Sequence, residues 1–487
     1  MMKKFHNMSI KKKILVGILF LIITYLIYFI ICLTIPFAKS PDVSSEYQEN
    51  FKLQKFFSNT ISVDRATIIE SSQDALDIRL QMLEQAKERI AISTFSIKTD
   101  RSSKEIVSCI LAAANRGVKV EILVDGLRGY IDMEDDPIYY ALGSHPNVEI
   151  RYYNMFSFLC PWTGNGRMHD KYILVDDELL ILGGRNISNY FIGEYNTSVL
   201  SYDRDILVYN TAAGTKDSKE SVITQVWDYF YSVWDCEYSE QVFHSIAKKD
   251  EKAVVAAHKT LEQLYHTIKL ERDILSTPLD FTRMTVATNK ITLVTNPIHI
   301  MSKQPYVWYE LSELMKHASS RVYIQTPYAV LNQDMYQDLK EIQANVPSVK
   351  IQLNSRAVGD NFVASADYTM NRKKIIKTGI TIFEFQGKYS MHGKSMLIDD
   401  DISVVGSYNL DMRSTYLDTE VMLVVHGKEF NQLLEGYIQA MEDQALPVLA
   451  DGSYGENKNV KAVSLPTDKK LLFGVCSVVF QLFRYLI

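Results

Sequence analysis

A pattern that occurs twice, once in each half of the chain, constrains this sequence more than any other feature. Each copy has a histidine, a lysine two residues later, an aspartate seven residues after the histidine and an asparagine seventeen residues after it. The copies consist of His169, Lys171, Asp176, Gly183, Gly184 and Asn186, and of His392, Lys394, Asp399, Gly406, Ser407 and Asn409. Chance would produce roughly 0.04 His-Lys-Asp triplets of this spacing in such a chain. The chain therefore contains a duplicated unit.

The spacing within each copy predicts a strand, a turn and a second strand. His169 and Lys171 are two residues apart, so on a strand both side chains would point to the same face, and the second copy has the same spacing. Asp176 and Asp399 fall at the turns, where we expect them to bind backbone or neighbouring groups and hold the loops. A lone strand histidine is more often structural, but a duplicated His and Lys pair indicates an anionic ligand.

The flanking segments also repeat an order of helix, strand, helix and strand. In the first half we expect these elements at Ser71 to Arg89, Ile90 to Ile97, Ser103 to Arg116 and Val118 to Gly126. In the second half we expect them at Val307 to His317, Arg321 to Tyr328, Gln333 to Ala344 and Val349 to Ser355. The sequence thus predicts two copies of one α/β unit.

These residues, in this order, resemble the phospholipase D superfamily over about residues 60 to 465. The resemblance includes GGRN after the first motif, and TPY (Thr326 to Tyr328) and GSYNLDMRS in the second half. Within the superfamily the pattern is most similar to bacterial cardiolipin synthases of the shorter, GGRN-bearing type. The resemblance implies two α/β/α sandwich domains with pseudo-two-fold symmetry, one shared active site between them, and neither a metal nor another cofactor.

The resemblance also implies a role for each motif residue. One histidine attacks phosphorus to form a phosphohistidine, and the other protonates the leaving alcohol and deprotonates the incoming one. Family precedent makes His169 the nucleophile and His392 the general acid and base, although the symmetry of the sequence leaves the choice open. The groups expected to hold the phosphate oxygens are Lys171, Lys394, Asn186, Asn409 and Ser407.

Each histidine is expected to need an acidic residue that orients its ring. Glu420 matches the acidic position of the family in the second half, and in the first half Asp203 is the candidate, with Asp205 as its competitor. A surface ion pair is the alternative for both carboxylates. The chain departs from the family at Asp418, where asparagine is frequent, and at Gly184, where serine is frequent.

The N-terminal region predicts a membrane anchor. Ile14 to Ile35 is an uncharged, mostly apolar run that is long enough to cross a hydrocarbon core of about 30 Å. The lysines before it (Lys3, Lys4, Lys11, Lys12 and Lys13) predict a cytoplasmic arm and an extracytoplasmic catalytic region. A cleaved signal peptide is the alternative. The longer cardiolipin synthases carry two N-terminal membrane helices, whereas this chain has one.

The expected organisation has six segments. They are a basic arm and transmembrane helix (1–39), a linker (40–60), a first catalytic domain (61–242), a helical connector (243–290), a second catalytic domain (291–465) and an apolar tail (466–487). The tail, which contains Gln481 and Arg484, is marginal for spanning a membrane, so it is expected either to lie at the membrane interface or to dock on the protein's own surface.

The predicted function is phosphatidyl transfer from phosphatidylglycerol to a second phospholipid, with phosphatidylethanolamine as a further candidate lipid partner. Three alternatives remain at this stage: a phospholipase D that releases phosphatidic acid, a membrane-anchored nuclease, and an anchored scaffold without activity. The net charge of −6 does not favour a nucleic-acid partner, although Arg372, Lys373, Lys374 and Lys377 could line a polyanion groove. The five scattered cysteines suggest neither a zinc site nor a disulfide framework.

Overall fold

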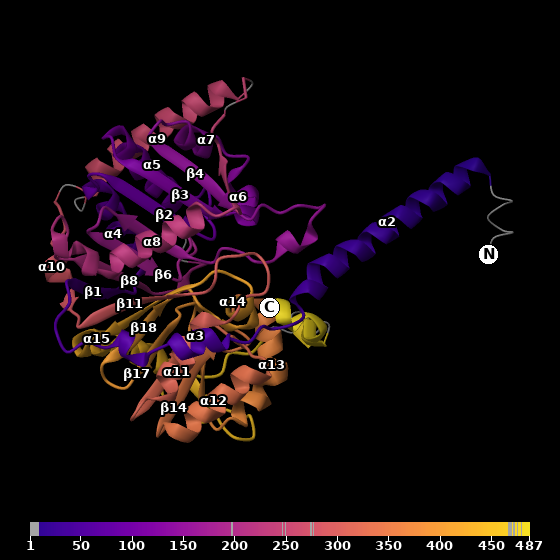
Figure 1. The fold of residues 1–487 in the computed structure, drawn as a ribbon, viewed down its shortest axis with the longest axis vertical. Helices are drawn as coiled ribbons and strands as arrows, with labels where there is room; N and C mark the ends of the chain where they lie inside the picture. Colours follow the sequence, from indigo (N-terminus) through magenta and orange to yellow (C-terminus); the bar gives the residue numbers. More distant parts are fainter. Residues whose placement is uncertain are drawn as a thin grey trace.

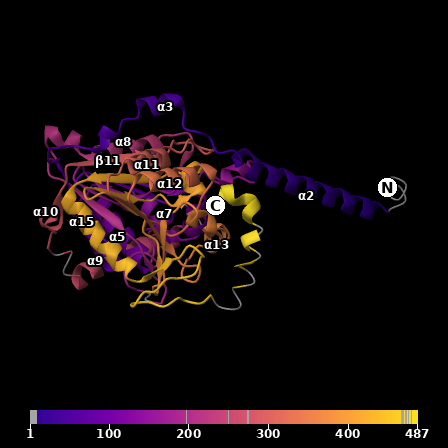
Figure 2. The same ribbon diagram turned by 90° about the horizontal axis from the view of Figure 1, so that it is seen from below.

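The computed structural model describes residues 9–195, 198–245, 247–248, 250–272, 275, 277–465, 470, 473–474, 476–478 and 480–487. Lys3 and Lys4 of the expected basic arm, and part of the expected apolar tail, lie outside these residues. The body of the molecule consists of two halves, drawn in indigo to magenta and in orange to yellow, and a long N-terminal helix projects away from it (Figures 1 and 2).

The first half is built around a sheet with the strand order β10-β1-β8-β6-β5-β2-β3-β4-β9. Its strands are β1 (Asp64–Ile69), β2 (Arg89–Thr94), β3 (Lys119–Asp125), β4 (Val148–Tyr153), β5 (Lys171–Val175), β6 (Leu179–Gly183), β8 (Asp205–Asn210), β9 (Ser239–Val242) and β10 (Val286–Ala287). Its helices are α4 (Ser72–Gln85), α5 (Arg101–Asn115), α6 (Gly126–Met133), α7 (Pro137–Gly143), η3 (Pro161–Gly164), η4 (Lys216–Glu220), α8 (Val222–Trp234) and α9 (Glu251–Glu271).

The second half is built around a sheet with the strand order β11-β20-β18-β17-β12-β14-β15-β21. Its strands are β11 (Lys290–Thr295), β12 (Arg321–Gln325), β14 (Ser348–Asn354), β15 (Thr381–Phe385), β17 (Ser395–Ile398), β18 (Ile402–Gly406), β20 (Val421–His426) and β21 (Ala445–Val448). Its helices are α11 (Tyr306–Lys316), α12 (Gln333–Asn345), α13 (Phe362–Ile376), α14 (Met412–Tyr416) and α15 (Lys428–Glu442). The short helix α10 (Phe281–Met284) precedes this sheet in the chain but packs on the first half, where Phe281 is part of the core. Two small two-stranded sheets pair β13 (Ala329–Val330) with β19 (Leu410–Asp411), and β7 (Ser201–Tyr202) with β16 (Ser390–Met391).

The two large sheets match strand by strand. The order β1-β8-β6-β5-β2-β3-β4-β9 corresponds to β11-β20-β18-β17-β12-β14-β15-β21, and in both sheets three parallel strands are flanked by antiparallel ones. The predicted duplication of one α/β unit is therefore confirmed. The expected helices and strands also occur, but the first helix ends at Gln85 because β2 already begins at Arg89.

Local chemistry explains where the helices of these units begin. The side chain of Ser71 accepts a hydrogen bond from the backbone N–H of Asp74 at the start of α4, and Asp100 accepts one from Ser103 at the start of α5. Apolar positions of α4 and α5 face the first sheet and form one core with it. A second core lies under α11 and α12, and a third contains residues of both sheets together with α8 and α15. Burial in the third core joins the halves.

The N-terminal segment consists of α2 (Ile10–Thr34), η1 (Ile35–Phe37), α3 (Ser45–Asn50) and η2 (Leu53–Phe56). Among the described residues, α2 with η1 is the helical segment that is long and apolar enough to cross a membrane. The segment expected as a linker crosses the second half: Tyr47 stacks on Tyr306 with ring centroids 3.7 Å apart, and Phe56 is fully buried. The chain enters the first sheet only after this contact.

The described part of the C-terminal tail docks on the second half. Arg484 Nε lies 3.0 Å from Asp367 Oδ1 on α13, and the backbone N–H of Arg413 donates to the carbonyl of Ile487. The tail also presents Val478 and Leu482 to solvent. Figures 1 and 2 both place the C-terminus beside the base of α2.

Candidate active site

The two histidines occupy equivalent places in the two sheets. His169 precedes β5 and His392 precedes β17, and each of these strands forms a hairpin with the next one. The sequence placed each histidine on the regular strand. Instead β5 begins at Lys171 and β17 at Ser395, so both histidines lie in extended segments just outside the sheet.

Short parallel pairings between the halves bring the two motifs together. Met168 forms an isolated bridge with Thr419, and Met391 of β16 pairs with Tyr202 of β7. In each pairing the following residue is a histidine in one segment and an acidic residue in the other. The parallel register therefore places each histidine beside an acidic residue from the opposite half.

Both histidines bind these acidic residues directly. His169 Nδ1 lies 2.8 Å from Glu420 Oε1, and His392 Nδ1 lies 2.6 Å from Asp203 Oδ2. Where such a carboxylate is ionised it only accepts hydrogen bonds, and the pairing then places the ring hydrogen on Nδ1 and leaves the lone pair on Nε2. The sequence singled out both acidic residues, but only the structure shows that each one orients the histidine of the other half.

Asp205, the competitor of Asp203, has a different role. Its carboxylate lies 2.9 Å from the Arg79 guanidinium and 3.1 Å from that of Arg185, and all three residues are buried. Asp203 and Glu420 are also buried, which excludes the alternative of a surface ion pair for them.

Ser407 does not offer a free hydroxyl to a phosphate, contrary to the prediction. Its Oγ donates to Glu420 Oε2 and accepts a hydrogen bond of 3.0 Å from the backbone N–H of Val421. Ser407 therefore supports the carboxylate that orients His169. In the first half the equivalent residue is Gly184, and a Cβ there would lie 2.3 Å from Asp203 Oδ1. The carboxylate of Asp203 fills the space that a serine side chain would need.

The two lysines of the motifs are almost fully buried. Lys171 Nζ donates to the carbonyl of His169 at 2.5 Å, and Lys394 Nζ donates to that of His392 at 2.5 Å. Burial lowers the pKa of Lys171 to about 7, although Glu420 opposes this shift. Burial also lowers the pKa of Lys394, and Asp203 opposes the shift there. Two closely placed cations in a dry site would gain from binding an anion.

Asn186 and Asn409 also occupy equivalent places, three residues after β6 and β18 end. Within the described part of the chain, the Oδ1 atom of each is buried and has no hydrogen-bond partner. Buried polar groups in proteins are almost always paired, so an unpaired group at a site indicates a missing ligand. Each amide can present its NH2 group to an anion by rotating its terminal bond.

The two histidine pairs differ in their electrostatics. Burial, followed by the charge of Lys171, holds the pKa of His169 well below its ordinary value. Burial raises the pKa of its partner Glu420 to about 8. At the other pair, burial of Asp203 is outweighed by the charges of Lys394 and His392, which hold its pKa below its usual range. The first pair therefore favours a neutral histidine and the second an ionised carboxylate.

Asp176 and Asp399 lie at the far ends of their strands from the histidines. Each has a positive φ, 51° and 53°, a conformation that aspartate adopts more readily than most residues. Asp176 accepts hydrogen bonds from the backbone N–H groups of Lys87, Glu88 and Arg89, and Asp399 accepts them from those of Ser319, Ser320 and Arg321. These hydrogen bonds attach each hairpin to the start of a neighbouring strand.

Several residues around the histidines carried no signal in the sequence. The Phe95 ring packs edge-on against His169 with centroids 5.4 Å apart, and the Phe191 ring packs against His392 at 5.1 Å. Thr419 Oγ1 accepts a hydrogen bond from the backbone N–H of His169. A pattern search on charged and nucleophilic residues misses these contacts because Phe95 and Phe191 lie in segments distant in sequence from the histidines they contact.

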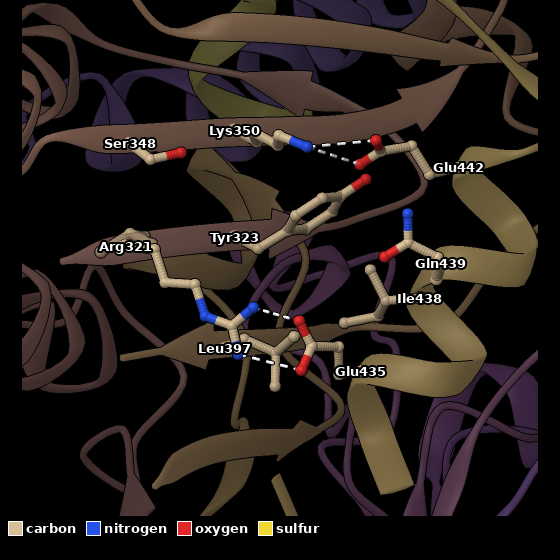
Figure 3. Close-up of a pocket in the computed structure, with 10 residues that line it drawn as sticks. Arg321, Tyr323, Ser348, Lys350, Leu397, Glu435, Ile438, Gln439 and Glu442 are labelled. Atoms are coloured by element: carbon tan, nitrogen blue, oxygen red, sulfur yellow. Dashed lines mark hydrogen bonds and ion pairs between the residues drawn. The ribbon is translucent and has the colours of Figure 1, made fainter. Parts of the chain in front are cut away.

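A pocket elsewhere in the second half is not part of this site. It lies between β12, β14 and α15, and its charged residues face one another: Lys350 Nζ is 3.1 Å from Glu442, and Arg321 Nη2 is 3.1 Å from Glu435 (Figure 3). Arg321 begins β12 at the end that binds Asp399, so the pocket lies at the opposite end of the strands from His392.

Known proteins resemble this chain over most of its length. The family described as "Cardiolipin synthase, PLD-like domain" matches residues 80–234 and 311–442. Cardiolipin synthase C of Escherichia coli (strain K12) is 27% identical over 427 residues, which cover 79% of this chain and 86% of that protein. Cardiolipin synthase B of the same strain is 23% identical over 382 residues, which cover 76% of this chain and 78% of that protein.

A solved structure shares the fold. The crystal structure of phosphatidylserine synthase from Haemophilus influenzae Rd KW20 covers 87% of this chain and 95% of its own, with a TM-score of 0.61 and 14% sequence identity. The two segments matched by the family contain one histidine motif each. The duplicated units are thus the parts of the chain that known proteins share.

Proposed function

The chain belongs to the phospholipase D-like family of cardiolipin synthases, and from this membership we propose that it transfers a phosphatidyl group between phospholipids. It is an enzyme of the phospholipase D superfamily. The donor would be phosphatidylglycerol, the acceptor the hydroxyl of a second phospholipid, and the product cardiolipin. The observation that carries the proposal is the pair of buried histidines, each held by a carboxylate of the opposite half.

In the first step, Nε2 of His169 attacks phosphorus as the P–O bond to glycerol breaks. His392 gives its proton to the departing oxygen, and glycerol leaves. In the second step, His392 takes the proton of the incoming lipid alcohol, whose oxygen attacks phosphorus as the P–N bond to His169 breaks. Both protons are accounted for, and the enzyme returns to its starting state.

The electrostatic difference between the pairs supports this division of roles. A histidine whose pKa is held low stays neutral and nucleophilic, which suits His169. The ionised carboxylate of Asp203 stabilises a protonated ring, which suits a general acid at His392. The sequence had left this choice to family precedent.

Lys171, Lys394, Asn186 and Asn409 would hold the non-bridging phosphate oxygens and stabilise the charge that develops in the transition state. The lowered pKa values of the lysines support this role, because a bound phosphodiester would stabilise their charged forms. The two amides would donate through their NH2 groups, since a phosphodiester only accepts hydrogen bonds. The same groups would serve hydrolysis, with water as the acceptor and phosphatidic acid as the product.

Two observations favour lipid over nucleic acid as the substrate. The basic residues that could line a polyanion groove lie at the C-terminal end of α13, where Arg372 Nε is 2.6 Å from Glu384. A hollow beside β7 is lined by residues that include Asp74 and Glu194, together with Glu70, whose carboxylate is paired with Arg204. The negative charges of Asp74 and Glu194 disfavour a polyanion there.

The apolar helix α2 and the cardiolipin synthase relatives mark the chain as a membrane protein. The lysines before α2 support a cytoplasmic N-terminus and a catalytic body on the other face of the membrane.

The product spectrum from vesicles tests the proposed reaction. We expect phosphatidylglycerol vesicles, with and without phosphatidylethanolamine, to yield cardiolipin and glycerol, and both products to be lost in His169→Ala and His392→Ala. Phosphatidic acid alone would make the protein a phospholipase. Turnover of single-stranded DNA without turnover of lipid would overturn the proposal.

A donor whose leaving group needs no proton tests the roles of the histidines. With a phosphatidyl nitrophenol, His392→Ala should still release nitrophenol in a burst and accumulate the phosphohistidine on His169, because only the second step requires His392. His169→Ala should give no burst. A burst in His169→Ala but not in His392→Ala would reverse the assignment.

A further inference from the structure

The loop between β4 and the first histidine motif exposes two large apolar side chains at its tip. Phe158 is 68% exposed and Leu159 is 79% exposed. Neighbouring residues of the loop, from Phe156 to Trp162, are also mostly apolar. An exposed apolar cluster of this kind is unfavourable in water and marks an interaction site.

This loop lies along the apolar helix α2. The hydroxyl of Tyr25 donates to the carbonyl of Phe158 at 2.9 Å, and that of Tyr28 donates to the carbonyl of Leu159 at 2.7 Å. At the foot of the loop, Asn165 Nδ2 donates to the carbonyl of Leu33 at 2.8 Å. The loop therefore follows the helix from its C-terminal end toward its middle.

These contacts set the depth of the loop if α2 crosses a bilayer. At about 1.5 Å per residue, the helix rises about 12 Å from Leu33 back to Tyr25. Half of a hydrocarbon core of about 30 Å is about 15 Å. Because Leu33 lies next to the end of the apolar run and Tyr25 binds the tip of the loop, Phe158 and Leu159 would lie well inside one leaflet.

The backbone carbonyls of the loop are suited to such a place. An irregular segment is tolerated in lipid only where its polar groups find partners within the protein. The carbonyls of Phe158 and Leu159 are bound by the two tyrosines of α2. The carbonyl of Ser157 accepts from the backbone N–H of Cys160, and the carbonyl of Cys160 accepts from both the backbone N–H and the hydroxyl of Thr163.

The foot of the loop is attached to the active site. Asn154 Nδ2 donates to the carbonyls of Asn165 at 2.8 Å and Gly166 at 3.0 Å, which closes the loop three residues before His169. Phe37, at the end of the anchor, is buried with Met412 beside the same region. The depth of the loop is thus coupled to the height of the catalytic histidines above the bilayer.

We propose that the segment from Phe156 to Trp162 is embedded in one leaflet beside α2, as a second membrane-inserted element that holds the active site at the level of the lipid phosphates. The occupant of this apolar surface is the hydrocarbon of a lipid bilayer. The docked tail, with Val478 and Leu482 exposed, extends the same side of the molecule at the base of α2 (Figure 2). The inference depends on α2 spanning a bilayer and not on which alcohol accepts the phosphatidyl group.

Quenching by brominated lipids tests the depth of the loop. The full chain would be reconstituted into vesicles of phosphatidylglycerol and phosphatidylethanolamine whose acyl chains carry bromine. We expect the emission that Phe158→Trp adds to the wild-type signal to lose more than about half of its intensity, because bromine in the hydrocarbon quenches only nearby indoles. Leu270→Trp is the control: this residue of α9 is 86% exposed, and the end of α9 that precedes α10 lies across the body from α2 (Figure 1).

Equal quenching of the two added tryptophans would overturn the proposal and leave a protein partner as the occupant of the loop. A double variant, Phe158→Ser with Leu159→Ser, adds a functional readout. It should stay in the membrane through α2, turn over vesicle lipid at least several-fold more slowly, and retain its activity on a short-chain phosphodiester in solution. If the double variant lost both activities while Phe158→Trp was still quenched, the double variant would have failed to fold. The proposal would then still stand on the quenching result, which requires no turnover.

Discussion

Each histidine of the active site depends on an acidic residue that lies in the other half of the chain. Glu420 holds His169 and is itself held by Ser407, whereas Asp203 holds His392 beside a glycine. The shorter acidic side chain, Asp203, lies beside Gly184, and the longer one, Glu420, lies beside the larger Ser407. The two pairs are equivalent in position but differ in chemistry, which suits a mechanism in which one histidine attacks while the other transfers protons.

We expect Glu420→Gln to lower kcat by roughly 100- to 10,000-fold, because an amide can offer its NH2 group to Nδ1 and stabilise the wrong tautomer of His169. The measurement is turnover of phosphatidylglycerol vesicles. Glu429→Gln is the matched control, since this carboxylate is exposed at the start of α15. Equal activity of the two variants, or a loss explained by a lower Tm, would contradict the orienting role.

The activity should depend on pH in a way that follows from the buried lysine. The pKa of Lys171 is lowered to about 7, so kcat/KM should fall as the pH rises through about 7 and this lysine loses its charge in the free enzyme. Bound phosphodiester raises that pKa, so kcat should persist to higher pH. The pKa of His169 is held well below its ordinary value, so the acid limb should lie below pH of about 6.5. A level kcat/KM through pH of about 9 would contradict this expectation.

At the scale of secondary structure, the two hairpins are the elements that carry the motifs. Each is fixed by an aspartate in its turn, which binds three consecutive backbone N–H groups at the start of a neighbouring strand. These hydrogen bonds fix the position of the hairpin relative to its neighbouring strand. Under the proposed mechanism, one motif therefore contains both reacting and structural residues.

We expect Asp399→Asn to lower the free energy of unfolding by about 1–2 kcal/mol at neutral pH, because an amide cannot accept all of these hydrogen bonds. Although burial opposes it, hydrogen bonding from Ser319 and Ser320 lowers the pKa of Asp399 to about 2. The stabilisation is therefore present above the ordinary pKa of aspartate and is lost as the pH falls through about 2. Urea unfolding at several pH values measures the effect.

The neighbouring Asp400 provides the control for this prediction. Its carboxylate is exposed and contacts Lys428, so Asp400→Asn should leave the free energy of unfolding unchanged. Activity per folded molecule should be retained in both variants. If Asp399→Asn removed activity without lowering stability, the aspartate would have a role in the reaction itself.

At the scale of the whole molecule, neither half can form the site alone. The strands β7 and β16 pair across the boundary, and each half supplies the partner of the other's histidine. The segment at 40–60 packs against α11 of the second half before the chain enters the first half. The N-terminal helix is therefore attached directly to the second half, although the first half follows it in the sequence.

An equimolar mixture of His169→Ala and His392→Ala chains should therefore remain inactive, because both histidines of a working site come from one chain. Lipid turnover in mixed proteoliposomes measures this. Recovery of about a quarter of the wild-type activity after the two chains are unfolded and refolded together would instead indicate that halves exchange between chains.

Much of this architecture follows from local patterns. Short apolar runs predict the strands, helical spacing predicts the helices, and the matched spacing of the motifs predicts the duplication, because these signals act between near neighbours in the chain. The prediction of an anchor helix follows in the same way from a continuous apolar run. The motif histidines and lysines, and the acidic residues Asp203 and Glu420, could all be named from the sequence.

The features that could not be predicted from the sequence all depend on contacts between residues that are distant in the chain. The histidine pairs join residues 189 and 251 positions apart, and their crossing arises from short parallel bridges that no periodicity encodes. The resemblance predicts a phosphate contact for Ser407, whereas its hydrogen bond to Glu420 is visible only in the folded chain. The sequence also gives no sign of the loop beside α2, because only the folded chain shows that Tyr25 and Tyr28 of this helix bind the carbonyls of the loop.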